Sequence, residues 1–352
     1  MPTAETPYRP LTVAAVRPET ADTVTLELTP ADGLPLVYRA GQYLTLVAHE
    51  HGQEVRRSYS FSSAPALNEP VRITIKRIAN GLMSRRLVDR VRPGDTLLTT
   101  GAAGLFVLPE DTRAVRQVWL LAAGSGITPV FSLLKTLLAT EPTLSAVLVY
   151  SNHAPATTIF REELLALAAR YPERLRIEWL YSNAPDLARA HLYKELLEDL
   201  VRQHATAPPA QLLAYVCGPL NYMRMCGYAL RELQLPPDNI RRENFNTEPP
   251  YVPPLLPPDT DAHPVTVHWA GREYQFSSQH PDTILQAARR HDLRLPYSCE
   301  AGRCGNCLAR CTQGRVWMSY NEVLTERDLA RGLVLTCTGY PVGGPVRLEI
   351  GG

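Results

Sequence analysis

The sequence has almost no excess of charge of either sign. Its 36 Lys and Arg residues nearly balance its 35 Asp and Glu residues, which leaves a formal net charge of +1. Proteins that bind nucleic acid need a basic footprint. The composition therefore argues against a nucleic-acid partner, although it leaves room for a local charged patch that docks one protein.

Long apolar runs are also missing. The longest uncharged stretch, residues 117–134, carries two glycines and a proline in its middle, which suits a strand, turn and helix better than a membrane span. The first ten residues, MPTAETPYRP, lack the basic and apolar segments of a secretory signal. We expect a cytoplasmic protein with no membrane partner.

What the sequence does contain is an uneven set of cysteines. There are seven, and the last fifth of the chain holds five of them: Cys299, Cys304, Cys307, Cys311 and Cys337. The number is odd and no secretion signal is visible, so the cluster favours metal ligation over disulfides.

The chain has 352 residues, and the spacing of its apolar residues changes along it, which indicates more than one domain. Short alternating runs predict an antiparallel β-barrel over residues 1–110. Apolar strands that alternate with helices predict a doubly wound parallel α/β sheet over residues 111–247. Residues 248–264 contain seven prolines and read as a linker. Residues 265–352 predict a small β-grasp (α+β) domain.

The cysteines at 299, 304 and 307 have the spacing C-x4-C-x2-C, and Cys337 follows at a distance. This is the plant-type ferredoxin pattern for a [2Fe-2S] cluster. Gly302 and Gly305 within the loop allow the backbone to approach the cluster closely. A zinc site is the alternative, but zinc sites usually pair two short C-x2-C segments, and only one is present.

The fourth ligand has two candidates, Cys337 and Cys311. Cys311 follows Cys307 by only four residues, in a stretch that reads as the strand leaving the loop. A ligand that arrives from far along the chain closes the site better, so we favour Cys337.

Two further motifs precede the cysteines. Residues 57–63, RSYSFSS, match the pattern R-x-Y-S-x-x-S, and residues 80–84, NGLMS, follow about 20 positions later. Residues 124–129, GSGITP, come directly after an apolar strand and open a helix, and residues 217–219, CGP, end another strand. Glycines in such turns let a pyrophosphate approach the backbone at a helix N-terminus.

With these motifs, residues 1–247 resemble the ferredoxin–NADP reductase superfamily, and residues 265–352 resemble a plant-type ferredoxin. The full order of domains resembles the reductase components of oxygenases, such as the phenylacetyl-CoA epoxidase reductase. This resemblance implies an FAD-binding barrel, an NAD(P)-binding α/β domain and a [2Fe-2S] ferredoxin domain.

The resemblance also implies the residues of the flavin site. Arg57 binds a phosphate, Tyr59 lies against the isoalloxazine, and Ser60 meets a ring nitrogen. The pyrophosphate lies on a helix N-terminus, and the implied flavin-binding segment comprises Lys76, Gly81, Leu82, Met83 and Ser84. This segment together with Arg57 favours FAD over FMN.

For the nicotinamide, the resemblance implies binding by two turns: Gly124, Ser125, Gly126, Ile127 and Thr128 in the first, and Cys217, Gly218 and Pro219 in the second. Thr128 is expected to touch the flavin too, and Cys217 to lie near the hydride path. With Ser60, these are the expected catalytic residues. Phe245, in a Glu-Asn-Phe segment, is expected to shield the flavin ring.

The choice between NADH and NADPH depends on the residues after the strand at 146–151. Thr157, Thr158 and Arg161 can bind a 2′-phosphate, and residues 152–160 contain no acidic residue for a ribose diol. The sequence therefore slightly favours NADPH.

Nicotinamide gives up two electrons as a hydride, a ferredoxin cluster accepts one, and a flavin converts between them. The order of motifs predicts electron flow from NAD(P)H through FAD and [2Fe-2S] to a partner protein, either a terminal oxygenase or a different acceptor such as a hybrid-cluster protein. A redox-sensing binding module with little turnover is the competing function.

Overall fold

The computed structural model describes residues 8–50, 52–246 and 255–351. They form two compact units, which divide the chain between Asn244 and Phe245. The first unit contains the flavin and nicotinamide motifs, and the second contains the cysteine cluster. Residues 248–254 of the expected linker lie outside the described residues, and the domain boundaries near 110 and 247 stay predictions.

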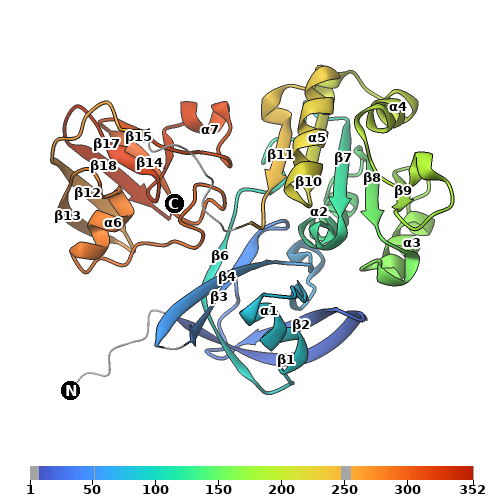
Figure 1. Cartoon of the computed structure of the whole chain (residues 1–352), viewed down its shortest axis with the longest axis horizontal. Helices are drawn as coiled ribbons and strands as arrows, with labels where there is room; N and C mark the ends of the chain where they lie inside the picture. Colours follow the sequence, from blue (N-terminus) through green and yellow to red (C-terminus); the bar gives the residue numbers. More distant parts are fainter. Residues whose placement is uncertain (1–7, 51, 247–254, 352) are drawn as a thin grey trace. The chain divides into compact units, whose positions relative to one another are not determined.

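The first unit begins with a six-stranded antiparallel sheet in the order β4-β3-β6-β1-β2-β5 (Figure 1). A bridge between Phe61, which follows β4, and Ile73 of β5 joins the two edge strands, so that the sheet closes on itself. Alternate side chains fill the interior, where Leu11, Leu26 and Leu44 are fully buried. The strands are β1 (Arg9–Thr20), β2 (Thr23–Pro30), β3 (Tyr43–Glu50), β4 (Gln53–Ser60), β5 (Val71–Lys76) and β6 (Thr96–Ala103), and helix α1 (Leu82–Asp89) follows β5.

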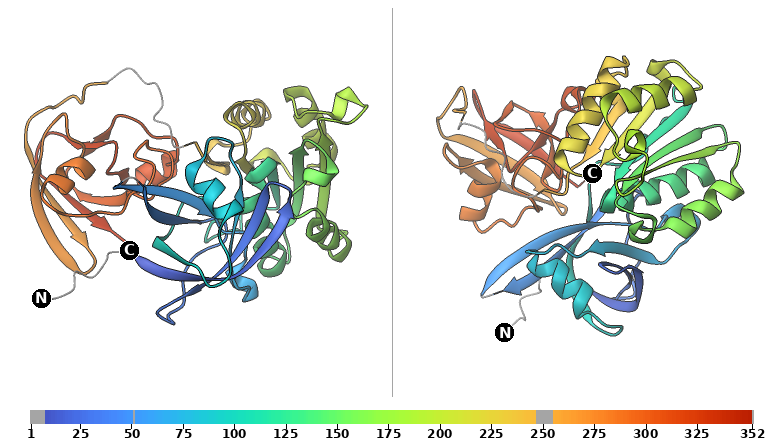
Figure 2. Two further views of the ribbon diagram at one scale, coloured as in Figure 1. Left: turned by 60° about the horizontal axis from the view of Figure 1, so that its bottom comes forward. Right: turned by 45° about the vertical axis from the view of Figure 1, so that its right-hand side comes forward.

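The rest of the first unit is a parallel sheet in the order β11-β10-β7-β8-β9. Its strands are β7 (Gln117–Ala123), β8 (Ser145–Asn152), β9 (Leu175–Tyr181), β10 (Leu212–Cys217) and β11 (Ile240–Glu243). The connecting helices are α2 (Ile127–Thr140), α3 (Arg161–Arg170), α4 (Lys194–His204) and α5 (Leu220–Glu232). Val118 and Leu120 of β7 pack with α2 and α3, whereas Trp119 and Leu121 pack with α4 and α5. Helices therefore cover both faces of the sheet (Figure 2), as in doubly wound folds.

Arg174, just before β9, fixes the end of α2. Its guanidinium donates to three backbone carbonyl oxygens at or just after the helix C-terminus: Leu138 at 3.0 Å, Glu141 at 2.6 Å and Leu144 at 3.0 Å. The last carbonyls of a helix lack partners within the helix, so this one side chain supplies a donor to carbonyls at this end of α2.

The second unit is built on a mixed sheet in the order β13-β12-β18-β14-β16, in which only the pair β12 and β18 is parallel among the described residues. Its strands are β12 (His263–Trp269), β13 (Arg272–Ser278), β14 (Leu308–Gln313), β16 (Leu333–Leu335) and β18 (Val346–Ile350). A two-stranded sheet pairs β15 (Val316–Met318) with β17 (Gly339–Pro341), and the helices are α6 (Ile284–Arg290) and α7 (Glu326–Ala330). The cysteine loop lies between α6 and β14.

The end of the expected linker, residues 248–264, differs from the prediction. Strand β12 begins at His263, so Pro264 is in the strand, where it pairs with Ser277. Pairing with β18 begins only at Val265, and a proline near the start of a strand therefore costs no ladder bond on that side. Among residues 8–50, 52–246 and 255–351, every helix is too short or too polar to cross a bilayer.

Candidate functional site

The loop before β14, with Cys299, Cys304 and Cys307, and the segment after β16, with Cys337, bring the four expected cysteines together as two pairs. The sulfur atoms of Cys299 and Cys304 are within hydrogen-bond distance of each other, and so are those of Cys307 and Cys337. Thr336 fixes the second pair, because its N–H and its hydroxyl both donate to the carbonyl oxygen of Cys307, at 3.1 and 3.2 Å. Two thiolates for each of two irons is the donor set of a [2Fe-2S] cluster.

Cys311 takes no part in these pairs. It lies on β14, and its thiol donates to the carbonyl oxygens of Gln313 at 3.3 Å and Gly314 at 3.7 Å. Within the described residues, no group of three His, Cys, Asp or Glu side chains converges as a site for a single metal ion. Zinc needs about four ligands around one point, so two neighbouring pairs fit a binuclear centre better.

The backbone around the cysteines already points toward sulfur. The N–H of Ala301 donates to Cys299 Sγ at 3.4 Å, and that of Asn306 donates to Cys304 Sγ at 3.5 Å. Gly302 has a φ of +69°, and a Cβ there would lie 2.8 Å from the Tyr320 carbonyl oxygen. The loop therefore needs glycine at this position, which lets its amides point at the cluster.

The pKa shifts of the cysteine thiols are consistent with a cation bound between them. A hydrogen bond with Cys304 lowers the pKa of Cys299 to about 6, while the pKa of Cys304 is well raised by the same bond and by burial. The pKa of Cys307 is raised by its hydrogen bond with Cys337 and by burial. Ferric ions bound here would supply the positive charge that lets the thiols ionise.

The flavin motif lies on β4 and at the start of α1. Arg57 is exposed, and its guanidinium donates to the Arg56 carbonyl oxygen at 2.7 Å. Tyr59 lies two positions after Arg57, and burial raises the pKa of its hydroxyl. Lys76, at the end of β5, pairs with Asp22 at 3.5 Å.

Gly81 is the N-cap of α1, and no side chain caps this helix. The first turn contains no acidic residue, Leu82 is 54% exposed, and Met83 is buried. Ser84 Oγ accepts from the Ile78 N–H at 3.1 Å and donates to the Gly81 carbonyl oxygen at 3.2 Å. An uncapped N-terminus without carboxylates is suited to a pyrophosphate.

One contact of the flavin motif is with a residue that the sequence motifs did not single out. Ser60 Oγ donates to Glu243 Oε2 at 2.9 Å, although the two residues are 183 positions apart. Burial raises the pKa of Glu243 to about 8. Glu243 ends β11 opposite Cys217 at the end of β10, so Ser60, Cys217 and Glu243 gather at one place. The only sequence signal was the Glu-Asn-Phe segment, from which Phe245 was chosen.

Phe245 itself is 45% exposed and belongs to the second unit, so its role at the flavin stays a prediction. Cys217 is fully buried, and burial together with the Glu243 carboxyl raises the pKa of its thiol. At neutral pH Cys217 is therefore an uncharged thiol.

The two nicotinamide turns lie against each other. A Cβ on Gly126 would be 2.1 Å from the Cys217 carbonyl oxygen and 2.9 Å from the Gly218 nitrogen. Gly124, with a φ of +54°, would place a Cβ in open space. Pro219 is the N-cap of α5, and no side chain caps that helix either. The carboxyl edge of the sheet therefore has an open glycine and an uncapped helix where a dinucleotide is expected.

The remaining residues of these turns lie at the start of α2. Ser125 precedes the helix, and Ile127 and Thr128 are its buried first residues. Thr128 Oγ1 donates to the Ser125 carbonyl oxygen at 3.0 Å, which fixes the geometry of the turn.

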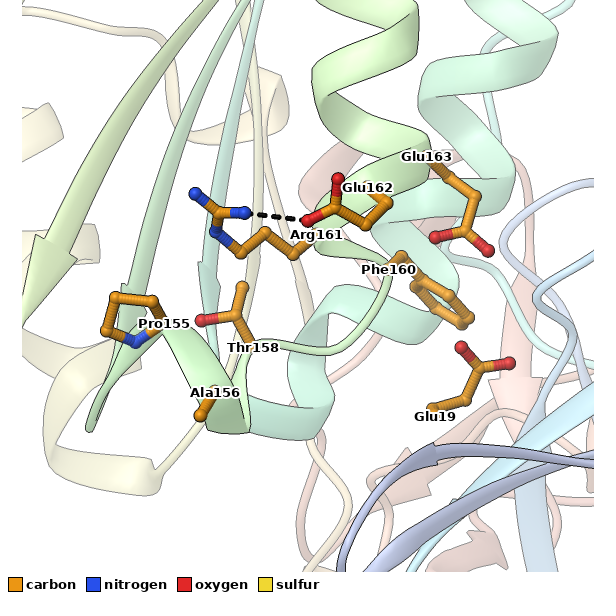
Figure 3. A pocket seen from close by; sticks show the side chains of 8 residues that line it. All are labelled: Glu19, Pro155, Ala156, Thr158, Phe160, Arg161, Glu162 and Glu163. Atoms are coloured by element: carbon orange, nitrogen blue, oxygen red, sulfur yellow. Dashed lines mark hydrogen bonds and ion pairs between the residues drawn. The ribbon is translucent and has the colours of Figure 1, made fainter.

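Thr158 and Arg161 line a pocket of about 360 Å³ at the start of α3, together with Glu19 from the barrel (Figure 3). Arg161 donates to Glu162 at 2.7 Å. Thr158 Oγ1 donates to the Ala154 carbonyl oxygen at 2.9 Å, as Thr157 Oγ1 does at 3.0 Å. The lining also includes Glu163, so carboxylates outnumber the one arginine.

Family models match three parts of the chain: an oxidoreductase FAD-binding domain over residues 11–108, an oxidoreductase NAD-binding domain over 120–227, and a 2Fe-2S iron-sulfur cluster binding domain over 267–342. The protein is therefore an oxidoreductase with sites for FAD, NAD(P)H and a 2Fe-2S cluster. The expected fold class, a barrel, a parallel sheet and a ferredoxin domain, is confirmed.

Relatives match nearly the entire chain. A protein of Escherichia coli named as one of the subunits of 1,2-phenylacetyl-CoA epoxidase is 34% identical, with 98% of each chain covered. The ferredoxin reductase component of 3-ketosteroid-9-alpha-monooxygenase of Rhodococcus rhodochrous is 33% identical, over 99% of this chain and 100% of the relative. NADH oxidoreductase HCR of Escherichia coli is 31% identical, over 97% and 98%. The chain belongs to the family of these three-domain flavin and iron–sulfur reductases.

Solved structures agree on the fold. Phthalate dioxygenase reductase superposes with a TM-score of 0.59 at 24% identity, over 97% of this chain and 98% of that one. An intact type IV self-sufficient cytochrome P450 monooxygenase gives a TM-score of 0.71 at 22% identity, with 97% of this chain and 41% of that chain covered.

Proposed function

We propose that this protein transfers electrons from a nicotinamide dinucleotide, through FAD and a [2Fe-2S] cluster, to a terminal oxygenase. The observation that carries the proposal is the presence, in one chain, of two cysteine pairs and a buried Ser60–Glu243 site at the carboxyl edge of a parallel sheet. The oxygenase acceptor is supported by the relatives, one named as part of an epoxidase and one as a monooxygenase reductase component.

In this proposal FAD is held by Arg57, Tyr59, Ser60, Lys76 and the start of α1, residues 81–84. Nicotinamide is held by the turns at residues 124–128 and 217–219. FAD held by these residues would supply the conversion between a two-electron hydride donor and a one-electron acceptor. The protein residues orient these groups, exclude water and hold protons.

Glu243 is the residue that holds a proton. With a pKa of about 8 its carboxyl is mostly neutral at pH 7, and the Ser60 hydroxyl is its hydrogen-bond partner at 2.9 Å. The neutral carboxyl can therefore deliver a proton, through the Ser60 hydroxyl, to a group bound beside Ser60 Oγ, and the carboxylate that this leaves can take a proton back. Cys217, a neutral thiol, adds no charge there.

For the cluster, we propose Cys299, Cys304, Cys307 and Cys337 as ligands. The pairing and the directed amides support this set, and the thiol of Cys311 is engaged on β14.

For the nicotinamide, we propose that NADH is the better donor, although the sequence slightly favoured NADPH. Arg161 is the arginine expected to bind a 2′-phosphate, but it is paired with Glu162. Glu19 and Glu163 line the same pocket. Burial is the main cause that raises the pKa of Glu19, and the nearby Glu163 carboxylate raises it further. A doubly charged phosphate would meet this acidic surface, whereas a ribose hydroxyl would not be repelled.

The test is steady-state oxidation of NADH and NADPH with two acceptors, ferricyanide and cytochrome c. We expect rapid turnover with both acceptors, and a higher kcat/KM for NADH. Absence of turnover in protein loaded with FAD and iron would favour the sensor function over the reductase. A kcat/KM that is higher for NADPH would contradict only the NADH proposal.

The name of one relative, NADH oxidoreductase HCR, includes no oxygenase, and an acceptor that is not an oxygenase is the second candidate. Affinity purification of the full chain from its own cells, followed by measuring electron delivery to the captured protein, separates the two. An acceptor without oxygenase activity would replace the oxygenase proposal and leave the electron-transfer proposal intact.

A further inference from the structure

Arg303 lies between the first two cysteines of the motif and is only 7% exposed. Its Nε donates to Glu322 Oε2 at 2.8 Å, and its Nη1 donates to the Asn246 carbonyl oxygen at 3.4 Å. A buried guanidinium is tolerated only when it is paired and hydrogen bonded. The Arg303 side chain is therefore held in one place, directly beside a cluster ligand in the sequence.

Glu322 is fixed as firmly as Arg303. Its Oε2 also accepts from the Tyr320 hydroxyl at 2.9 Å, and its N–H donates to the Gly302 carbonyl oxygen at 3.0 Å. The absence of a side chain at Gly302 lets the loop pack directly on Tyr320. Residues 302 and 303 are thus joined to residues 320–322 by both backbone and side-chain contacts.

The backbone of this fixed segment faces a cluster sulfur. The N–H of Ala301 donates to Cys299 Sγ at 3.4 Å, and the N–H groups of Arg303 and Cys304 are further hydrogen-bond partners of the same sulfur. An amide that donates to a ligand sulfur stabilises negative charge on the cluster, and the reduced cluster is the more negative form. The position of these amides therefore bears on the reduction potential.

We propose that the Arg303–Glu322 ion pair is a positioning device, which holds the backbone of residues 301–304 against Cys299 Sγ and so keeps the reduction potential of the cluster high. The inference deepens the proposed function and rests on it, because it requires the cluster. Arg303 and Glu322 act through the loop backbone and are not themselves ligands.

A second effect has to be separated from positioning. Removal of Arg303 alone would leave the half-buried Glu322 carboxylate without the guanidinium that neutralises it, and its negative charge would lower the potential directly. Removal of both charges eliminates that effect. Positioning predicts that the potential stays low in the double variant, whereas direct electrostatics predicts a return to the wild-type value.

The experiment is a redox titration of the full-length protein, monitored by the electron paramagnetic resonance signal of the reduced cluster. The variants are Arg303→Met, the double variant Arg303→Met with Glu322→Gln, and Arg310→Met, which removes an exposed arginine from β14 as a matched control. Iron, acid-labile sulfide and thermal unfolding are measured for each. If Arg303→Met does not assemble a cluster, Arg303→Lys takes its place, because lysine keeps the charge but not the planar fork of donors.

At a fixed potential, we expect the ratio of reduced to oxidised cluster to fall about tenfold in Arg303→Met and in the double variant. For a one-electron couple, this corresponds to a decrease in reduction potential of ~59 mV. Arg303→Lys is expected to fall less, and Arg310→Met to match the wild type. A double variant that regains the wild-type potential, or an Arg303 variant with a full cluster and an unchanged potential, would overturn the inference alone. Wild-type protein without iron and sulfide would overturn the proposed function as well.

Discussion

Replacing Glu243 by Gln is expected to stabilise the first unit at neutral and alkaline pH. Burial raises the pKa of Glu243 from 4.5 to about 8. Between these two values the folded protein binds more protons than the unfolded chain, so the wild type loses stability as the pH rises. A glutamine keeps an acceptor for the Ser60 hydroxyl but cannot ionise, and it removes this loss.

The size of the effect follows from the shift. One pKa unit corresponds to ~1.36 kcal/mol, so the loss in the wild type is roughly 3 kcal/mol at pH 7 and about 5 kcal/mol well above pH 8. Below about pH 4.5 both states are protonated and the loss vanishes. The difference between Glu243→Gln and the wild type should therefore grow with pH, whatever constant offset the substitution brings.

The assay is urea unfolding of the flavin-loaded protein at about pH 5, 7 and 9, followed by tryptophan fluorescence, since Trp119 is fully buried in the first unit. Glu232→Gln, which removes an exposed carboxylate at the end of α5, is the control. An infrared band of a neutral carboxyl group that disappears in Glu243→Gln reports the protonation directly. Stability curves that run parallel from about pH 5 to 9, with no such band, would refute the raised pKa.

Three other outcomes are expected. Cys304→Ser should lose the cluster and the reduction of cytochrome c while ferricyanide reduction by the flavin persists; loss of both activities in folded, FAD-loaded protein would contradict the electron path. Gly126→Ala should abolish saturation by NADH, because its Cβ would lie 2.1 Å from the Cys217 carbonyl oxygen, whereas Gly227→Ala, 3.9 Å from its nearest neighbour, should leave KM unchanged. Arg174→Met should lower the free energy of unfolding by about 2–4 kcal/mol, since it removes the guanidinium donor of three carbonyls at or just after the end of α2; a midpoint in urea equal to that of the wild type would disprove the capping role.

The sequence predicted elements well where a pattern is local. The alternating runs and the Gly-Ser-Gly turn located the barrel and the parallel sheet, because strand and helix periods are written in consecutive residues. Helix boundaries were less accurate. Helix α3, for example, begins only at Arg161, because Phe160 has a left-handed φ of +58°. Such a backbone conformation in a non-glycine residue leaves no pattern in the sequence.

In the candidate site, too, the residues of a local motif could be predicted, and those that depend on distant contacts could not. The cysteines were found because C-x4-C-x2-C is a local motif, and Cys337 could be proposed as the distant partner. Glu243 was missed because its partner, Ser60, is 183 residues away, and only the folded chain shows that contact. Arg161 was read as a phosphate ligand, and its pairing with Glu162 depends on side-chain conformations that residue types alone do not specify.

The two units present different chemistry because the reactions expected of them differ. Hydride transfer moves electrons together with a proton equivalent, and the first unit accordingly buries a carboxyl that is neutral near pH 7 beside a serine hydroxyl. A transfer of single electrons to a cluster requires no such proton site. There the second unit provides thiol pairs, backbone amides directed at sulfur, and a buried ion pair that fixes those amides. If the assignment is right, Glu243→Gln should change the pH dependence of flavin reduction by NADH and leave the potential of the cluster unchanged, whereas Arg303→Met should do the reverse.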